Sequence, residues 1–384
     1  MKLHYISPSV LPSRSANSVH VVRQCEGLAN IGVDVTLYTK RSVVEESCLE
    51  PLLRKAYGFE LPRGQVVSYY SASSRGDNLR IAVLALWTLF RKSWPDIILS
   101  RNLYAAYVIG VLLRRSLIFE THQLESGVRK AMQGAIMTCP WVTTLLISHK
   151  MLDFVERHHG KKPVRSLILH DAAPDGIVPL PPEERRRSLI RMTHQAEGAW
   201  EAVCGYFGHL YPGRGIEIIE AMAAARPQVL FLIYGGNDAD VQACRRGNSL
   251  HNLHYMGYVS YPAAQQAMRA MDVLLMPYQE SVSIGVKGHD TACWMSPMKM
   301  FEYLASGVPL ISSDLPVLRE VLLNGKNSLL AHPSRPESWL AALDRLLADP
   351  ALAQSLGAEG HQQYRREHTW TNRARRILEA IAAQ

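Results

Sequence analysis

The segment 296–314 carries the side chains whose types and spacing best suit ligand binding: SPMKMFEYLASGVPLISSD. Lys299 and Glu302 are three residues apart, so on a helix they share one face. We expect this helix to begin with Ser296 as its N-cap and Pro297 as its first residue. A lysine and free N–H groups at a helix N-terminus suit a phosphate, and a carboxylate suits the hydroxyls of a polyol. The alternative is an ordinary amphipathic helix with a surface Lys–Glu pair.

The string M-K-M-F-E-Y-L-A-S-G-V-P-L-I-S-S-D resembles the donor-site helix of family 4 glycosyltransferases, which are retaining enzymes with the GT-B fold. Gly307 is expected to end the helix, as glycine commonly does. The resemblance implies that Glu302 binds the ribose of a sugar nucleotide. It also implies that Pro297, Met298 and Lys299 lie against the sugar and the diphosphate.

A loop rich in glycine follows a predicted strand in the second half of the chain and resembles the family's diphosphate loop. It starts at Gly208 and reads G-H-L-Y-P-G-R-G, so the backbone can approach a ligand closely. The family usually has an arginine and a lysine where this chain has His209 and Arg214, and Arg214 can still bind two phosphate oxygens. The glycine turn at Gly235 resembles the family's turn beneath the diphosphate. The turn that includes Tyr258 resembles the one that meets the nucleobase.

Further candidates follow strands in the first half. His122 ends the string F-E-T-H, and the resemblance implies that it lies near the anomeric carbon and the sugar hydroxyls. The alternative is a structural histidine at the end of a strand. Arg101 and Asn102 end the preceding strand and are expected to line the cleft. Ala16 and Asn17 begin a helix whose N–H groups suit a phosphate or sugar oxygen, and Asn17 is expected to cap it.

The family's Glu-x7-Glu motif is incomplete in this chain. Trp294 stands eight residues before Glu302, where the family has the glutamate that contacts the donor sugar. Asp290 and Glu280, in the loop that precedes the helix, are the candidates to replace it. The glycines and histidine in 285–289 predict that this loop is mobile.

Strands and helices alternate along the chain, which predicts an α/β protein with two doubly wound sheets. Together with the resemblance, this implies the GT-B fold, in which two Rossmann-like domains face a central cleft. We expect an N-terminal acceptor-binding domain at 1–175 and a nucleotide-sugar-binding domain at 176–365, with a linker and the start of the second domain in the proline-rich stretch 171–199. A C-terminal helix at about 366–384 is expected to pack back on the first domain. The predicted strands cover 2–6, 33–38, 97–100, 117–121, 142–148, 166–170, 204–207, 229–234, 273–276 and 310–312. The predicted helices start at 17 or cover 103–113, 216–224, 298–305, 337–348 and 352–381.

The amino-acid composition indicates the cellular compartment of the protein. The six cysteines are scattered without a C-x-x-C pair, which argues against a disulfide framework or a cysteine metal site. The apolar run 81–90 is too short to span a membrane, and the N-terminus has no signal-peptide pattern. We therefore expect a cytoplasmic protein.

Positive charge is concentrated in the first half. Residues 1–196 hold 26 Lys and Arg against 16 Asp and Glu, a net of +10, and the remainder holds 16 against 18, a net of −2. This charge predicts an anionic partner: a phospholipid surface that gives peripheral membrane contact, or a phosphorylated acceptor. The alternative is a solvated surface without a partner. No nucleic-acid-binding motif is present, so nucleic acid is not expected as a partner.

Together, these features predict a retaining, metal-independent glycosyltransferase without a cofactor. Its catalytic residues would be His122, Arg214 and Lys299. It would move a sugar from a nucleotide donor, UDP-linked before GDP-linked, to a hydroxyl of a glycan or lipid-linked acceptor. The alternatives are a sugar-nucleotide epimerase with the same fold, a phosphorylase with a Schiff-base lysine, and an inactive scaffold.

Overall fold

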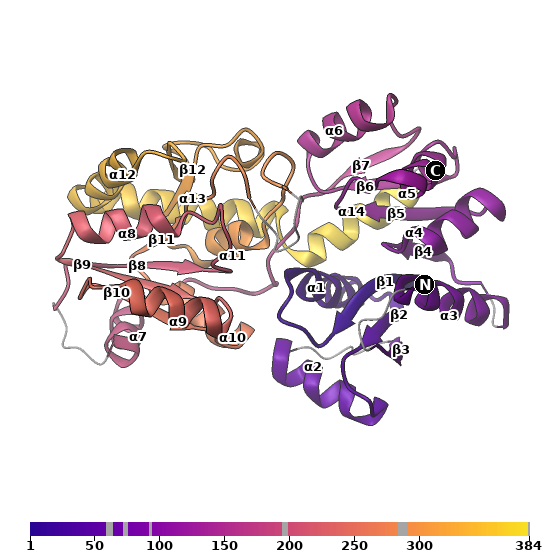
Figure 1. Ribbon diagram of the computed structural model, residues 1–384, viewed down its shortest axis with the longest axis horizontal. Coiled ribbons are helices and arrows are strands. Elements are labelled where there is room, and N and C mark those ends of the chain that lie inside the picture. Colours follow the sequence, from indigo (N-terminus) through magenta and orange to yellow (C-terminus); the bar gives the residue numbers. More distant parts are fainter. Residues whose placement is uncertain (59–63, 72–75, 92–93, 194–198, 283–289, 383–384) are drawn as a thin grey trace. The chain divides into compact units, whose positions relative to one another are not determined.

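The computed structural model describes residues 1–382 except 59–63, 72–75, 92–93, 194–198 and 283–289. The chain forms two compact α/β units (Figure 1). The first unit comprises Met1–Asp171 and Thr369–Gln384, and the second comprises Ala172–His368. Two Rossmann-like units were predicted, and this is confirmed. The first unit was predicted to end at residue 175 and to include the chain again from about residue 366, whereas it ends at Asp171 and resumes at Thr369.

The first unit is built on a seven-stranded sheet in the order β3-β2-β1-β4-β5-β6-β7, and all of its strand pairs are parallel. Strand β5 shows why these segments form central strands: all five of its residues are buried, as expected for a parallel sheet covered by helices on both faces. The order reverses between β1 and β4, which makes their carboxyl ends the natural ligand edge. The strands are β1 Lys2–Leu11, β2 Asp34–Arg41, β3 Gly64–Tyr70, β4 Ile97–Ser100, β5 Leu117–Thr121, β6 Val142–Leu146 and β7 Ser166–Ile168.

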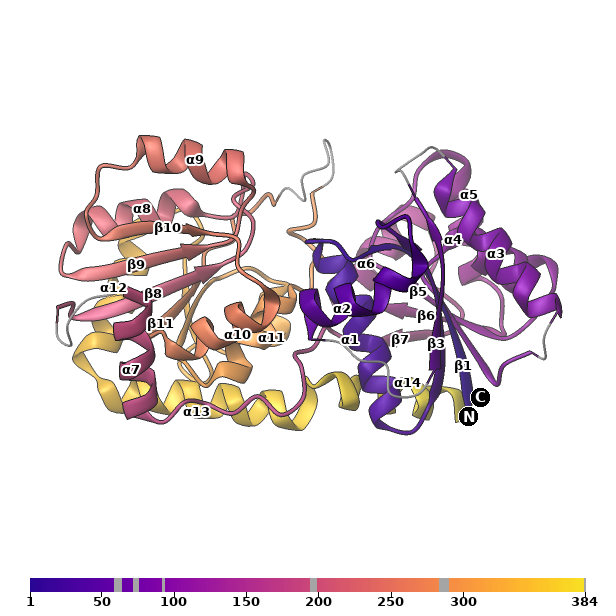
Figure 2. The same ribbon diagram turned by 90° about the horizontal axis from the view of Figure 1, so that it is seen from below.

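The helices of the first unit cover this sheet, and Figure 2 shows α3 at its periphery. Helix α14, from the end of the chain, packs against α1 within this unit. The helical elements are α1 Ala16–Asn30, η1 Glu46–Cys48, α2 Leu49–Tyr57, α3 Asp77–Arg91, α4 Leu103–Ala106, the π-helical turn η2 Tyr107–Leu112, α5 Gly127–Met137, α6 His149–His159 and α14 Trp370–Ala382.

The second unit repeats the same topology with six strands in the order β10-β9-β8-β11-β12-β13, again parallel throughout. Its order reverses between β8 and β11. The strands are β8 Ala202–Phe207, β9 Val229–Tyr234, β10 Leu253–Gly257, β11 Val273–Met276, β12 Leu310–Ser313 and β13 Leu329–Ala331. Its helical elements are α7 Pro182–Thr193, α8 Ile216–Ala225, α9 Asp238–Gly247, α10 Tyr261–Ala270, α11 Met298–Ser306, η3 Leu318–Glu320, α12 Pro336–Ala348 and α13 Pro350–Glu367.

Several boundaries differ from the sequence prediction. The predicted linker contains helix α7, because Pro182 and two glutamates at its start suit a helix N-terminus despite the surrounding prolines. The predicted helix 352–381 is two helices, α13 and α14, separated at His368 and Thr369.

Two predicted helix caps were also wrong. Helix α1 is capped by Ser15 and not by Asn17, since the extended Ser15 places its hydroxyl to accept from the Asn17 N–H. Helix α11 starts at Met298, as its predicted range 298–305 has it, but its N-cap is the extended Pro297 and not Ser296. Its end at Gly307, in the left-handed conformation, is as predicted.

Within the described residues, none of the helices combines the length and the apolar character required to cross a bilayer.

Candidate functional site

The best-formed candidate site in the second unit lies at the carboxyl ends of β8 and β11, where the strand order reverses. The loop after β8 supplies Gly208, His209 and Arg214, and the residues just after β11 supply Tyr278. Lys299 comes from the first turn of α11. Segments far apart in the sequence therefore meet at one edge of the sheet.

Lys299 is the central feature of this site. Its Nζ is inaccessible to solvent, although the residue as a whole is partly exposed, and it makes no hydrogen bond to any described residue. The ammonium lies 4.1 Å from the ring centroid of Tyr206 and 4.9 Å from that of Tyr278. Burial and the nearby Arg214 hold the pKa of Lys299 well below its usual range, and Glu302 only partly opposes them. A covered cation without a hydrogen-bond acceptor is costly, so the site favours an anion.

Arg214 adds a second positive charge beside Lys299. Its Nη1 donates to the Tyr278 hydroxyl over 3.0 Å, and its guanidinium lies 5.1 Å from the Tyr278 ring centroid. Burial raises the pKa of the Tyr278 phenol, although Arg214 opposes this shift. Tyr278 thus remains a neutral partner that positions the arginine without neutralising it.

Glycine is required at two positions where the loops of this site meet. Gly235 has a φ of +108°, and a Cβ there would lie 2.1 Å from the carbonyl oxygen of Gly208. A Cβ on Gly208 would itself lie 2.7 Å from Lys299 Nζ. The Gly235 N–H donates to the Gly257 carbonyl over 2.8 Å, which places the turn before Tyr258 beside the same loops. The glycines let three strand ends approach one another closely.

Glu302 lies one turn beyond Lys299 on α11 and is 6% exposed. Its Oε1 accepts a hydrogen bond of 2.6 Å from the hydroxyl of Tyr261, at the start of α10. The Lys299 ammonium and the Glu302 side chain are thus both covered within the unit, which argues against the alternative of a solvent-exposed Lys–Glu pair.

The remaining predicted residues of the second unit surround these groups or lie apart from them. The His209 ring stacks on Tyr211 at 4.7 Å, and burial with the charges of Arg214 and Lys299 lowers the pKa of His209. Pro297 and Met298 form the start of α11. Tyr258 is 45% exposed.

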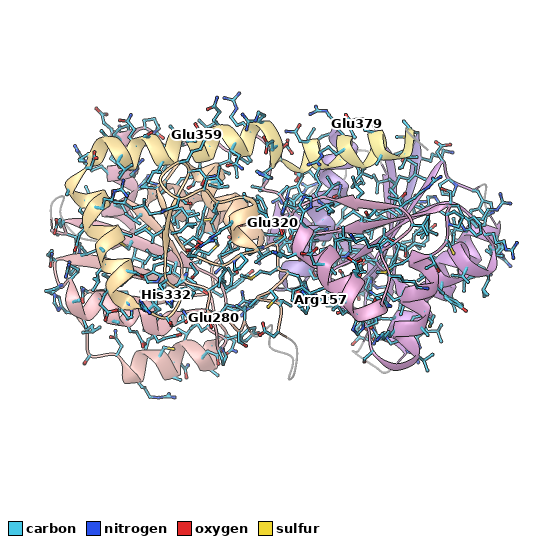
Figure 3. The ribbon with its side chains drawn as sticks, turned by 90° about the horizontal axis from the view of Figure 1, so that it is seen from above. Arg157, Glu280, Glu320, His332, Glu359 and Glu379 are labelled. Atoms are coloured by element: carbon cyan, nitrogen blue, oxygen red, sulfur yellow. The ribbon has the colours of Figure 1, made fainter. Side chains whose placement is uncertain are left out.

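The loop before α11 is only partly described. Asp290 Oδ1 accepts hydrogen bonds of 2.9 Å from both the Val282 and the Ala292 N–H. Glu280 is exposed just beyond β11, and Figure 3 labels it. The loop 285–289, which was predicted to be mobile, lies outside the described residues.

The first unit contains a second cluster, built around the buried carboxylate of Glu120 at the end of β5. Its Oε1 lies 3.0 Å from His122 Nε2, 3.1 Å from His20 Nε2 and 2.8 Å from Arg373 Nη2. His20 Nδ1 in turn lies 3.0 Å from Asp171 Oδ1. Burial acts to raise the pKa of Glu120, but Arg373 and the two histidines together hold it well below its usual range.

This cluster determines the charge and the tautomer of the His122 ring. Burial and the Arg101 charge lower the pKa of His122 to about 4, against the opposing effect of Glu120, so the ring is neutral at physiological pH. Its Nε2 carries the proton donated to Glu120, which leaves Nδ1 as a hydrogen-bond acceptor. His122 can therefore accept from a hydroxyl.

The three side chains His20, Glu120 and His122 also have metal-ligand types, with one ligand atom of each lying within 4.8 Å of the others. However, the Glu120 oxygen already accepts from Arg373, whose positive charge opposes a cation at this point. We therefore interpret the cluster as a hydrogen-bonded charge network.

Other predicted residues of the first unit have local structural contacts. Asn102 caps α4 by accepting from the Ala105 N–H over 3.0 Å, and its amide donates to the Asn78 carbonyl over 2.7 Å. Ala16 begins α1, and the Asn17 amide donates to Ser9 Oγ over 2.7 Å.

Comparison with known proteins gives a family match that lies mostly in the second unit. Residues 214–379 match the family model described as "Glycosyl transferase-like", a match that begins at Arg214 and includes Lys299 and Glu302. This stretch is less than half of the chain, and over it the chain is similar to the group 1 glycosyltransferases.

The curated proteins that the chain resembles are distant from it. The D-inositol 3-phosphate glycosyltransferase of Jonesia denitrificans is 24% identical over 52% of this chain and 46% of its own length. The phosphatidyl-myo-inositol mannosyltransferase of Mycolicibacterium smegmatis is 26% identical over 42% of this chain and 39% of its own length. The chain thus spans about half the length, or less, of these curated relatives.

Comparison with solved structures shows that the chain has the GT-B fold. Anabaena Alr3699/HepE, crystallised in complex with UDP-glucose, superposes with a TM-score of 0.71 over 100% of both chains at 14% identity.

Sequence reasoning missed several residues of both clusters. The sequence analysis did not single out Tyr206, Tyr278 or Tyr261, because a tyrosine next to a strand usually packs in the core. Glu120 lies in a buried strand, where a carboxylate is unexpected, and that anomaly was the available signal. Arg373, some 250 residues away in sequence, carried no such signal.

Proposed function

We propose that the chain is a glycosyltransferase that moves a sugar from a UDP-sugar donor, held by the second unit, to an acceptor hydroxyl with retention of anomeric configuration. The observation that carries the proposal is the covered ammonium of Lys299, which has no hydrogen-bond partner among the described residues and lies beside Arg214. Two such cations at the carboxyl edge of a parallel sheet suit a diphosphate. Glu302, one turn along the same helix, would accept from the ribose hydroxyls.

The proposed reaction is same-face substitution. The acceptor oxygen forms a bond to the anomeric carbon as the bond from that carbon to the diphosphate oxygen breaks. The acceptor proton moves to the departing diphosphate, which leaves as UDP. Arg214 and Lys299 would stabilise the negative charge that develops on that diphosphate, so the protein need not supply a strong base or a metal ion.

His122 would assist from the first unit. Its neutral ring offers Nδ1 as an acceptor, a role suited to holding a sugar hydroxyl. The charge network around Glu120 would fix the orientation and the tautomer of the ring.

Two kinds of relative support the substrate classes. HepE was crystallised with UDP-glucose, which favours a UDP-sugar over a GDP-sugar. The two curated relatives are named for inositol acceptors that carry phosphate, and this suits the positive first unit. The acceptor would be a glycan or a lipid-linked molecule with an anionic group.

The test is a product assay with the purified protein, a panel of UDP- and GDP-sugars, and glycan or lipid extracts. We expect UDP release that depends on the acceptor. Conversion of the sugar nucleotide without release would instead indicate an epimerase. Binding of nucleotides with neither outcome across the panel would indicate an inactive scaffold.

A further inference from the structure

Helix α3 of the first unit is apolar on two opposite faces. One face packs onto the sheet, since α3 contacts β1, β2 and α4, and it buries Ile81, Ala82, Ala85 and Leu89. The other face is exposed to solvent. A helix that is apolar all round is normally enclosed, so the exposed face of α3 requires an explanation.

The exposed face is a continuous stripe of large side chains. Leu79, Val83, Trp87 and Phe90 are 52%, 57%, 54% and 62% exposed. At about 100° per residue these four positions fall within about 80° of arc, so they lie along one line of the helix. Leu84 and Trp87 also line a shallow groove with neighbours on the same helix.

A second exposed apolar segment adjoins the end of this stripe. Phe90 contacts Trp94, with ring centroids 6.1 Å apart, and Arg115 lies 5.6 Å from the Trp94 ring centroid. Arg115 follows η2, whose end exposes Leu112 by 61% and Leu113 by 36%. Six of the fifteen strongly exposed large apolar side chains among the described residues therefore belong to one surface.

Cations border this surface and acids are missing from it. Arg80 and Arg91 flank the stripe, with the Arg91 guanidinium 4.2 Å from the Trp87 ring centroid. Arg80 also forms an ion pair of 3.6 Å with the buried Asp77 at the start of α3. Arg114 and Arg115 are exposed at the end of η2. The sequence contains no Asp or Glu at 78–95 or 97–119. The α3 surface is defined here by these apolar and basic side chains: Leu79, Arg80, Val83, Trp87, Phe90, Arg91, Leu112, Leu113, Arg114 and Arg115.

We propose that the α3 surface docks on an anionic lipid bilayer, with its apolar side chains in the acyl–headgroup boundary and its arginines on the lipid phosphates. Tryptophan beside arginine, on a helix that lies along the surface, is the pattern that suits this interface. The whole first unit has the complementary charge, with 25 Lys and Arg against 14 Asp and Glu, a net of +11. A surface that binds another protein would not need to lack Asp and Glu throughout 78–95 and 97–119, whereas a surface that binds anionic lipid would.

The proposal is independent of the proposed catalysis, because its readout is binding. The experiment is sedimentation of the full-length protein with vesicles of phosphatidylcholine alone or with phosphatidylglycerol added. We expect at least tenfold tighter binding to the anionic vesicles, and weaker binding at high salt. Binding that ignores lipid charge, or none at all, would overturn the proposal.

Two pairs of variants locate the surface. W87S/F90S and R114E/R115E should each weaken vesicle binding at least tenfold. K161E/K162E makes the same charge change at an exposed basic pair elsewhere in the unit, and Val128→Ser removes an apolar side chain that is 80% exposed. Both control variants should bind like the wild type. Equal loss in K161E/K162E and R114E/R115E would show that only overall charge matters and would sink the assignment to α3.

A second copy of the chain is the other occupant that the test distinguishes. If the wild type is a dimer in solution, W87S/F90S makes it monomeric, and neither form binds vesicles, then a homodimer and not a bilayer covers the α3 surface. Size-exclusion chromatography with light scattering on the same samples gives this result. Near-native circular dichroism is expected for every variant, because all the substituted side chains are exposed.

Discussion

Glu302 has a structural hydrogen-bond partner in addition to its proposed role as a ligand group. Its carboxylate accepts from Tyr261, and its charge also acts on Lys299 of the proposed diphosphate site. The sequence predicted its role from a motif, but the hydrogen bond to Tyr261 could not be foreseen. Tyr261 follows a different strand and is 41 residues away.

Glu302→Ala should weaken UDP binding on the order of tenfold or more, since a hydrogen bond to a charged group contributes about 1.5–3 kcal/mol. Calorimetry on the folded variant measures the change. Tyr261→Phe keeps the carboxylate and removes only its local partner, so it should bind UDP nearly as well as the wild type. Unchanged affinity in Glu302→Ala would refute a ribose contact.

His122→Ala should slow transfer roughly tenfold or more, because a sugar hydroxyl would lose its acceptor. UDP affinity should stay close to that of the wild type, since the second unit holds the nucleotide. Steady-state kinetics and UDP titration of one preparation separate the two effects. An equal loss of UDP affinity would indicate that His122 contacts the nucleotide, which would contradict our account.

At the scale of elements, helix α14 is tied to β5 by a buried ion pair. Arg373 donates to Glu120 over 2.8 Å, and its Nε donates to the His170 carbonyl over 3.0 Å. Their side chains are 2% and 0% exposed. The sequence predicted that a C-terminal helix returns to the first domain. The ion pair itself was not predictable, because Arg373 and Glu120 are 253 residues apart in sequence and no local motif links them.

Arg373→Met should reduce the free energy of unfolding by about 3–5 kcal/mol at neutral pH, because it leaves the Glu120 charge buried without its main partner. The Glu120 pKa is depressed in the folded wild type, so the stability from its charge is lost as pH falls through that pKa. The difference between wild type and variant should therefore shrink in acid. Denaturant unfolding at two pH values measures it, with Arg373→Lys as the variant that keeps the charge. A difference that grows in acid would contradict the pairing.

The turn after β9 requires a glycine at position 235. Gly235→Ala would place a methyl group against the Gly208 carbonyl at a positive φ, and we expect destabilisation of about 1–3 kcal/mol. Gly247, at the end of α9, meets nothing within 4 Å, so Gly247→Ala should be neutral or slightly stabilising. Thermal unfolding of the two variants compares them. Equal melting temperatures would show that the loops after β8 and β9 are not tightly apposed.

Over the whole molecule, the sequence predicted two doubly wound sheets, because the alternation of strands and helices can be recognised from the sequence without knowing which residues are in contact. Strands Ile97–Ser100, Leu117–Thr121, Val229–Tyr234 and Val273–Met276 have their predicted bounds. Edge strand β3 was not predicted, since its residues are mostly half-exposed and give a weak apolar signal. Individual site residues were predicted where a motif marked them, whereas the tyrosines and the Glu120 network depend on folding.

The central claim is that the second unit binds a nucleoside diphosphate through Lys299 and Arg214. The most direct measurement compares the affinity of the full-length protein for UDP and for uridine, in the wild type and in Lys299→Met. The wild type should prefer UDP by at least a hundredfold, since two cations contact the diphosphate and each charged hydrogen bond contributes about 1.5–3 kcal/mol. In Lys299→Met that preference should fall at least tenfold while uridine affinity stays constant. A preference that is the same in both proteins, or absent from the wild type, would contradict the account.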